Sequence, residues 1–360
     1  MWHRALADIN GERHHQILDD ALSILVNLEH RGGTGLEKNT GDGAGILFQV
    51  PHHFFRKEAQ KCGQILPAEG DYGVAMLFFP QDEKGVEDAR RVFEEGCAEA
   101  GVPLLFWREV PVDPHDLGET ARACMPTILQ AFLGRPDDTP AGDAFERRLY
   151  VCRRTIEKKA DAEFALRDKI FCVCSMSSRT VVYKGMLVAT QMRRFFIDLN
   201  DAAVKTAVAL VHSRYSTNTT PSWERAHPNR FIIHNGEINT LKGNVNWIRA
   251  REPNLYSPVL QHDLERVMPI INREGSDSAI LDNVLEFLVM NGRPLTRAAS
   301  MLLPEPWDHN DSLSEERRAT TPTSPCSWSR GTVLPLSPLP TVARWVPPST
   351  VTACVPPATM

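Results

Sequence analysis

The sequence lacks several features that would assign it to particular classes of proteins. No segment approaches the run of about eighteen apolar residues that a membrane-spanning helix needs. The segment from Met1 to Asn10 has no apolar stretch of the secretory kind, and the spacing of the eight cysteines matches no disulfide framework. Lysine and arginine are scattered through a chain of net charge -5, which does not favour a polyanionic partner. These absences predict a cytoplasmic protein that binds neither membrane nor nucleic acid.

The sequence does contain enough apolar material for a folded core, with 42% hydrophobic residues in a chain of 360. Helical spacing of apolar residues predicts helices at Arg13–Glu29, Val86–Ala100, Glu119–Phe132, Ala160–Arg167, Asp277–Met290 and Pro294–Leu303. Apolar or alternating runs predict strands at Ile46–Val50, Tyr72–Phe79, Leu104–Val110, Arg147–Arg153, Lys169–Ser175, Thr180–Lys184, Ala207–Val211 and Arg230–His234. The strands at 169–175 and 180–184 are expected to pair with each other.

The composition of the chain changes after Arg318. From Ala319 to Met360 there is no aspartate, glutamate or lysine, and prolines occur in pairs. A proline-rich segment without periodicity is typical of a disordered tail. We therefore predict one folded domain over residues 1–318 and a separate tail over residues 319–360.

Two cysteines on one predicted strand are the first candidates for a metal site. Cys172 and Cys174 are two residues apart, so their side chains point to the same face of a strand. No second pair of cysteines stands at a spacing that would complete a set of metal ligands. We interpret both as thiols that pack as small apolar side chains, and we expect no metal in this chain.

Three polar stretches stand where a predicted strand ends or a predicted helix begins. Arg214 follows the strand at 207–211, the pair Asn235-Gly236 follows the strand at 230–234, and Asp277 opens a helix. A guanidinium and a carboxylate match the two charges of an amino acid. An asparagine side chain beside a glycine N–H supplies the donors of an oxyanion hole.

Each of these signals also has a purely structural interpretation. Asn-Gly is common in turns, Ser276-Asp277-Ser278 is common at helix caps, and a single arginine usually forms a surface ion pair. The combination of the three stretches favours a site for an amino acid whose side-chain carbonyl group is attacked.

Longer segments around these residues resemble one family. The segments from Val211 to Trp223, from His234 to Trp247 and from Gly275 to Ala279 closely resemble the class II glutamine amidotransferase domain of glutamate synthases. Further similar segments are Glu29 to Gly32, Gly41 to Ile46 and Val182 to Met186. The resemblance runs from about Ala7 to Arg318.

The resemblance implies an α+β fold of the N-terminal-nucleophile hydrolase type, an αββα four-layer sandwich with two antiparallel sheets between helices. It also implies that glutamine is hydrolysed to glutamate and ammonia, and that the ammonia is transferred to 2-oxoglutarate. By the same resemblance, Arg214 binds the substrate carboxylate, Asp277 binds its ammonium group, and Asn235 and Gly236 form the oxyanion hole. Arg31 falls in a loop packed near the nucleophile.

The resemblance also implies where cofactors and protein partners belong. In the family, FMN and an iron–sulfur cluster lie in regions beyond this chain, so we expect no cofactor here. Electrons reach the full-length enzymes from a small subunit or another donor. The sequence identifies neither the donor nor the oligomeric state.

The family's nucleophile is a cysteine at the first position of the mature chain, whose own α-amine serves as the base. The resemblance places that position at Met1, and the first cysteine of this sequence is Cys62. A methionine thioether cannot form a thiolate. We therefore expect the chain as written not to hydrolyse glutamine. Two alternatives remain, a non-catalytic glutamine-binding protein and a non-functional gene remnant.

The genetic code suggests how the cysteine was lost. Met1-Trp2-His3 is encoded ATG TGG CA-, and the frame one base later reads TGT GGC, which encodes Cys-Gly. The segment from Ser327 to Val342 can likewise be read, in a shifted frame, as a string similar to glutamate synthases. We therefore expect residues 1–6 and the tail at 319–360 to be out of frame. The nucleotide sequence around both junctions tests this hypothesis.

Overall fold

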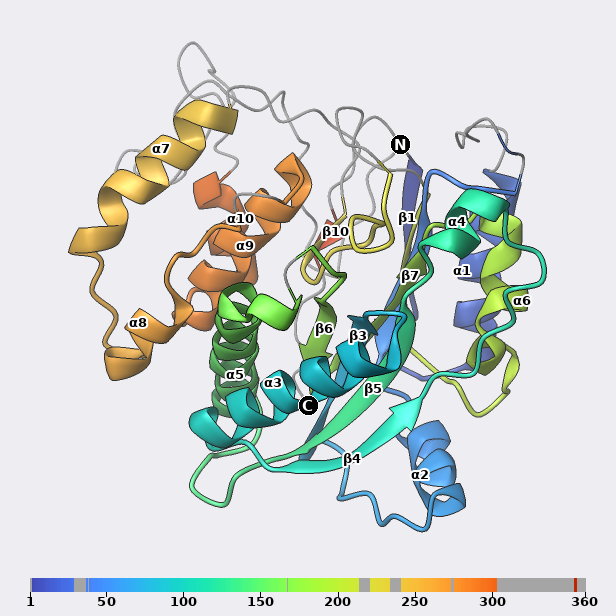
Figure 1. Ribbon diagram of the computed structural model, residues 1–360, viewed down its shortest axis with the longest axis horizontal. Helices are drawn as coiled ribbons and strands as arrows, with labels where there is room; N and C mark the ends of the chain where they lie inside the picture. The colour runs from blue at the N-terminus through green and yellow to red at the C-terminus, as the bar shows by residue number, and fades with distance from the viewer. Residues whose placement is uncertain are drawn as a thin grey trace.

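The computed structural model describes residues 2–28, 37, 39–166, 168–213, 221–233, 241–272, 275–302 and 353–354. Within these residues the chain forms two four-stranded sheets with helices on both sides (Figure 1). Sheet 1 has the strand order β1 (Trp2–Ala7), β8 (Val208–Ser213), β2 (Ala44–Gln49), β7 (Thr180–Gly185). Sheet 2 has the order β4 (Leu104–Glu109), β5 (Thr127–Gly134), β3 (Tyr72–Phe79), β6 (Cys172–Ser177). All neighbouring strands in both sheets are antiparallel.

The described helices lie in three groups. Helices α1 (His15–Asn27), α4 (Glu119–Ala123) and α6 (Met192–Phe195) lie on one side of the sheets, and α3 (Glu83–Ala100) and α5 (Asp143–Ala162) lie on the other (Figure 1). Helix α2 (His52–Lys61) follows β2. The third group is α7 (Leu241–Arg251), α8 (Leu264–Val267), α9 (Asp277–Met290) and α10 (Leu295–Leu302). None of the described helices is long and apolar enough to span a bilayer.

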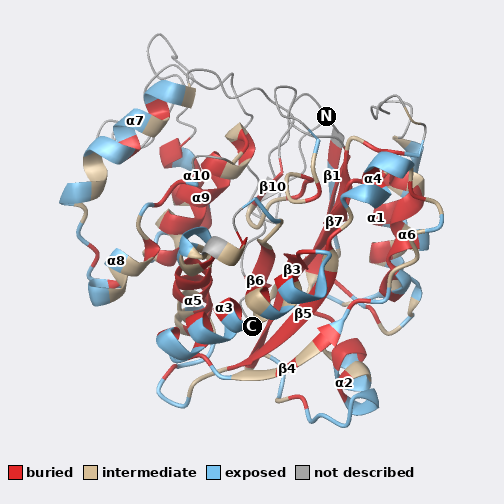
Figure 2. Cartoon of the chain, in the orientation of Figure 1, coloured by how far each residue is buried: buried red, intermediate tan, exposed pale blue. Residues whose placement is uncertain are grey.

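Alternation along the strands divides the core into two main clusters. On β3, Ala75, Leu77 and Phe79 face helices α3 and α5, whereas Val74 and Met76 face the other way. The second face shares one cluster with sheet 1 and helix α1. Figure 2 shows strands β3, β5 and β7 as almost entirely buried. Because β3 is covered on both faces, all eight of its residues are buried.

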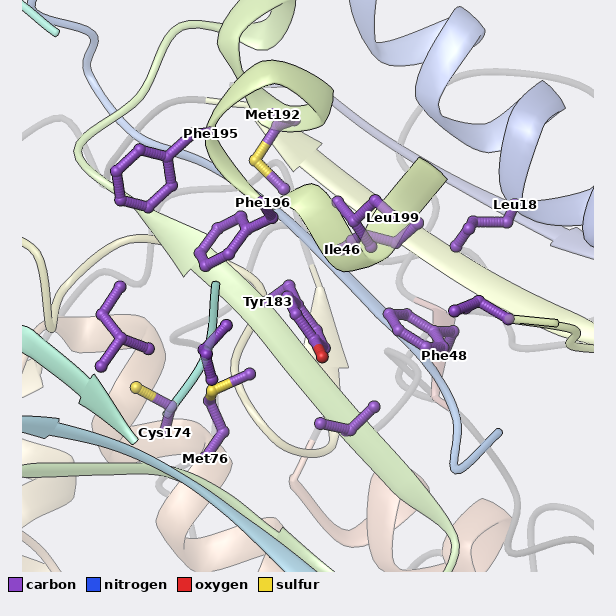
Figure 3. Close-up of a cluster of buried hydrophobic side chains, with 14 of the residues drawn as sticks. Leu18, Ile46, Phe48, Met76, Cys174, Tyr183, Met192, Phe195, Phe196 and Leu199 are labelled. Carbon is purple, nitrogen blue, oxygen red and sulfur yellow. The ribbon is translucent and has the colours of Figure 1, made fainter. Parts of the chain in front are cut away.

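Tyr183 lies at the centre of the cluster that joins the two sheets. Its ring stacks on Phe48 of sheet 1 at 5.4 Å between centroids and meets the edge of Phe196 at 5.1 Å (Figure 3). Its hydroxyl accepts a hydrogen bond from Gln130 of sheet 2 at 3.0 Å and donates one to Asp198 at 2.8 Å. This tyrosine therefore ties both sheets to the short 3-10 helix Ile197–Asn200.

Several predicted elements have the bounds that the sequence indicated, and others are wrong. The strand Tyr72–Phe79 and the helix Asp277–Met290 are confirmed residue for residue. The segment 147–153 is not a strand but the middle of α5, and 127–132 is not helical but belongs to β5. The predicted strands at 169–175 and 180–184 correspond to β6 and β7, which lie in different sheets and do not pair.

The last described strands are short. Strand β9 (Ile232–Ile233) is shorter than the predicted strand at 230–234, whose final residue lies outside the described residues. It pairs with β10 (Ala353–Cys354), the one part of the segment 319–360 that the structure describes. The predicted disorder of that segment stays a prediction.

Candidate active site

One end of sheet 1 collects the segments that the sequence singled out. Trp2 pairs with Ser213, Ser213 pairs with Ala44, and Ala44 pairs with Gly185. The strands alternate in direction, so this end holds the starts of β1 and β2 and the ends of β8 and β7. In the sequence Met1 directly precedes Trp2 and Arg214 directly follows Ser213. The register therefore brings together the chain positions that lead to the expected nucleophile and to the expected carboxylate-binding arginine.

Three glycines allow the segments near this end to approach one another closely. A Cβ atom added to Gly45 would lie 2.3 Å from the carbonyl oxygen of His227. A Cβ atom on Gly185 would lie 2.4 Å from the ring of Trp223, and one on Gly41 would lie 2.1 Å from the carbonyl oxygen of Leu187. No side chain fits at such separations, which explains why glycine stands at these positions.

The segment that resumes at residue 221 is anchored against this end of the sheet. Trp223 is buried and donates a hydrogen bond from Nε1 to the carbonyl oxygen of Ala121 at 3.0 Å. The buried Lys184 of β7 donates from Nζ to the carbonyl oxygen of Glu224 at 2.7 Å. Trp223 and Glu224 are thus held against helix α4 and strand β7.

Helix α9 brings the expected ammonium-binding carboxylate. Ser276 caps the helix, with its side chain accepting a hydrogen bond from the Ala279 N–H at 3.2 Å. Asp277 is the first helical residue and is half-buried, and its Oδ1 accepts a hydrogen bond from the Ser278 N–H at 2.7 Å. The positive end of the helix dipole stabilises a carboxylate at this position. The cap interpretation therefore holds for Ser276, and the cap sets Asp277 at the start of the helix.

A fully buried carboxylate on the same helix holds the residues that lead to Asn235. Oδ1 of Asp282 accepts hydrogen bonds from the backbone N–H groups of Phe231 at 2.8 Å and of Ile232 at 2.9 Å. Ile233, two residues before Asn235, lies in one buried apolar cluster with Leu210 of β8. The approach to Asn235 therefore contacts both the Asp277 helix and the strand that leads to Arg214.

Comparison with known proteins identifies this arrangement. The family described as glutamine amidotransferases class-II matches residues 4–322. The chain belongs to the class II glutamine amidotransferases. The two antiparallel sheets flanked by helices agree with the N-terminal-nucleophile hydrolase fold of this family, which confirms the predicted fold class.

Glutamate synthases are among the similar class II proteins. The chain is 46% identical over 313 residues to the glutamate synthase [NADPH] large chain of Bacillus subtilis, covering 87% of this chain and 20% of that protein. It is 41% identical to the glutamate synthase [NADH] of Schizosaccharomyces pombe, covering 86% of this chain and 15% of that protein. It is 40% identical to the chloroplastic ferredoxin-dependent glutamate synthase of Oryza sativa, covering 86% of this chain and 19% of that protein. The chain thus spans a fifth or less of the length of these relatives.

Of the predicted amidotransferase site residues, Asp277 is described. Met1, Arg31, Arg214, Asn235 and Gly236 lie outside the described residues, and their roles stay predictions. A cavity of about 250 Å³ lies between α5 and α9, and another of about 510 Å³ is lined by Trp223 and Lys169. Asp277 is not among the described residues that line either cavity.

The cysteine pair considered for metal binding lies beside the core. Cys174 is buried, Cys172 is half-buried, and their sulfur atoms are 4.0 Å apart. Within the described ranges, no three His, Cys, Asp or Glu side chains form a group that could hold a metal ion. The sequence did not identify Asp282 as a functional residue, because a polar residue within an apolar helix shows only as a break in the apolar repeat.

Proposed function

We propose that this chain is the glutamine-hydrolysing domain of a glutamate synthase, which produces ammonia for transfer to 2-oxoglutarate in the full-length enzyme. The observation that carries the proposal is the register at one end of sheet 1, where Trp2 pairs with Ser213. The residues next in sequence to a nucleophile at residue 1 and to a carboxylate-binding group at residue 214 are paired there. The similarity to glutamate synthases over most of the chain supports the same assignment.

The proposed reaction divides the hydrolysis of one amide into two steps. The thiol of a cysteine at residue 1 attacks the side-chain carbonyl carbon of glutamine, while the α-amine of the same residue takes the thiol proton. Asn235 and the Gly236 N–H stabilise the oxyanion, and the proton passes to the departing nitrogen, which leaves as ammonia. Water then cleaves the thioester to glutamate and restores the thiol. Arg214 and Asp277 hold the α-carboxylate and the α-ammonium group throughout.

A chain with methionine at residue 1 lacks the atom that begins this sequence of steps. We propose that the protein as written binds glutamine without hydrolysing it. The Asp277 helix terminus, with its capping serine, supports retention of the binding half of the site. Binding without hydrolysis is also what the second candidate function, that of a glutamine-binding protein, requires.

Restoration of the nucleophile tests the proposal. In the double variant Met1→Cys and Trp2→Gly, produced with a cleavable residue ahead of it to expose the terminal amine, glutamine should release ammonia. The matched control is Met1→Ser with Trp2→Gly, whose hydroxyl is a much weaker nucleophile, and it should be nearly inactive. A cysteine variant that is folded, has a free terminus and releases no ammonia refutes the assignment.

Calorimetry separates the glutamine-binding protein from a non-functional remnant in the chain as written. Binding of glutamine at millimolar or tighter affinity, lost in Asp277→Ala, supports a retained substrate site. The absence of binding in a folded chain refutes the glutamine-binding alternative.

We place the FMN and the iron–sulfur cluster of the parent enzyme outside this chain, together with the contacts to a small subunit or other electron donor. The support for this placement is that the chain spans a fifth or less of the length of the glutamate synthases it resembles. A cytoplasmic location stays a prediction.

A further inference from the structure

Asp282 makes contacts that a purely apolar core position would not need. Its side chain is fully buried in α9, and its two oxygens accept hydrogen bonds from backbone N–H groups of a segment 50 to 52 residues earlier. Oδ1 accepts from Phe231 at 2.8 Å and from Ile232 at 2.9 Å, and Oδ2 accepts from Arg230 at 3.3 Å. Three successive N–H groups of one segment therefore converge on one carboxylate.

These contacts join two parts of the expected site. Asp282 lies five residues after Asp277, so the two residues are about 7.5 Å apart along the axis of the same helix. The segment at 230–232 runs into Ile233, two residues before Asn235. Asp282 therefore ties the helix that begins at Asp277 to the segment that leads toward Asn235.

A buried ion network keeps Asp282 and its surroundings in place. The guanidinium of Arg230 lies 3.8 Å from Asp282 and donates from Nε to Glu286 at 3.2 Å. Glu286, one turn further along α9, also accepts from Arg153 of α5 at 2.5 Å. Arg153 in turn bonds Glu157 at 2.6 Å. The helix that carries Asp277 is therefore held on α5 as well as on the segment at 230–232.

We propose that Asp282 is a positioning residue for glutamine hydrolysis, setting the oxyanion-hole segment in register with the substrate-binding end of α9. The inference rests on the proposed function. Asp282 does not touch glutamine in this scheme. It acts through the N–H groups of residues 230–232, which lead to Asn235 and Gly236.

The scheme predicts a particular kinetic pattern. The negative charge on the carbonyl oxygen develops during the attack, so a displaced oxyanion hole weakens transition-state stabilisation while ground-state binding stays the same. Substrate binding through Arg214 and Asp277 does not use the segment that Asp282 holds. Loss of Asp282 should therefore lower kcat by about 10- to 100-fold and change KM by less than about 3-fold.

Three substitutions in the restored-cysteine chain separate geometry from charge. Asp282→Ala removes every acceptor, and Asp282→Glu keeps the charge but moves the oxygens outward by one methylene group. Asp282→Asn keeps Oδ1 as the acceptor for Phe231 and Ile232, so it should retain kcat within about 5-fold of the parent. In Asp282→Glu and Asp282→Ala, kcat should be lower than in the parent by the full factor of about 10 to 100.

The control is Glu146→Ala, which removes another buried carboxylate. Glu146 on α5 accepts hydrogen bonds from the Ser178 N–H at 2.6 Å and from the hydroxyl of Ser177 at 2.8 Å. These serines precede β7, whose first residue, Thr180, lies at the end of sheet 1 opposite to Gly185. The control should lose stability without losing kcat.

All rates are divided by the number of active sites, counted by mass spectrometry after alkylation of the terminal cysteine with a diazoketone analogue of glutamine. This normalisation removes the effect of a partly unfolded sample. If the alanine variant does not fold, the glutamate variant gives the same comparison.

The inference is overturned if Asp282→Glu or Asp282→Ala has the same kcat per labelled site as the parent. It is also overturned if the kcat of Asp282→Asn is as low as that of Asp282→Ala. If the parent chain with the restored cysteine is neither alkylated by the analogue nor able to hydrolyse glutamine, the proposed function itself is wrong.

Discussion

Arg108 provides the strongest test of how the two sheets are held together. This β4 residue is buried, and its guanidinium donates to Asp198 through both terminal nitrogens at 2.8 and 2.7 Å. It also donates to Gln130 at 2.9 Å and to Glu58 at 2.9 Å. Burial disfavours the charge on Arg108, but Asp198, the phenolic oxygen of Tyr183 and Glu58 raise its pKa above the ordinary value. We expect Arg108→Met to destabilise the fold strongly.

The magnitude follows from what the substitution leaves behind. Methionine keeps most of the volume, so the main loss is the countercharge of Asp198, whose side chain is also buried. Of the bonds described for that carboxylate, only the one from the Tyr183 hydroxyl at 2.8 Å would remain. Removing one partner of a buried pair costs about 3–5 kcal/mol, against a total stability of about 5–15 kcal/mol for a typical domain.

Urea unfolding followed by circular dichroism at pH 7.5 measures this loss. The double variant Arg108→Met with Asp198→Asn should recover part of the stability, because it removes the stranded charge. As a surface control, Arg91→Ala should leave the unfolding midpoint close to that of the parent, since Arg91 forms exposed ion pairs with Glu95 and Glu163. A loss below about 1 kcal/mol in Arg108→Met would refute the view that this arginine neutralises a buried carboxylate.

Three further predictions concern the site and the elements that hold it. Burial raises the pKa of Asp282 to about 6, although Arg230 opposes the rise and Glu286 adds to it. The free energy of unfolding should therefore fall as the pH rises from about 4 to about 6, because the folded state keeps a proton that the unfolded state has already lost. Over the same rise in pH, Asp282→Asn should gain about 3 kcal/mol of stability relative to the parent in urea titrations, and a constant difference would contradict the shift. Gly185→Ala should lower the thermal midpoint by several degrees, because its Cβ would lie 2.4 Å from the Trp223 ring, and an unchanged midpoint would show that the ring moves freely. In the restored-cysteine chain, Asp277→Ala should reduce kcat/KM for glutamine by about 100-fold through lost ammonium binding, whereas unchanged kinetics would exclude that role.

The elements that the sequence predicted best are those with one unambiguous period. Asp277–Met290 has a capping serine, an apolar repeat and no competing strand pattern, so both ends are predicted correctly. The segment 147–153 does not by itself show the helical period, because it excludes Phe145 and Ile156. With them, the buried face Phe145, Leu149, Cys152, Ile156 repeats at helical spacing. The segment 127–132 belongs to a strand buried on both faces, and its largely apolar sequence resembles that of a buried helix.

The pairing of strands and the candidate site could be predicted only in part. Strands β6 and β7 are separated by Ser178 and Arg179, which suggested a hairpin, yet each joins a different sheet. Sequence spacing gives no information on such a change of sheet. For the site, the sequence identified Asp277 at the start of its helix, and it could not identify Asp282, because the contacts of that residue are long-range.

The pairing of Trp2 with Ser213 also bears on how the protein should be produced. A tag fused ahead of the chain would lead into β1 at the end of sheet 1 where β8 ends at Ser213. Under the proposed function, such a tag would also convert into an amide the α-amine that takes the thiol proton. Purification handles should be attached at the carboxyl end.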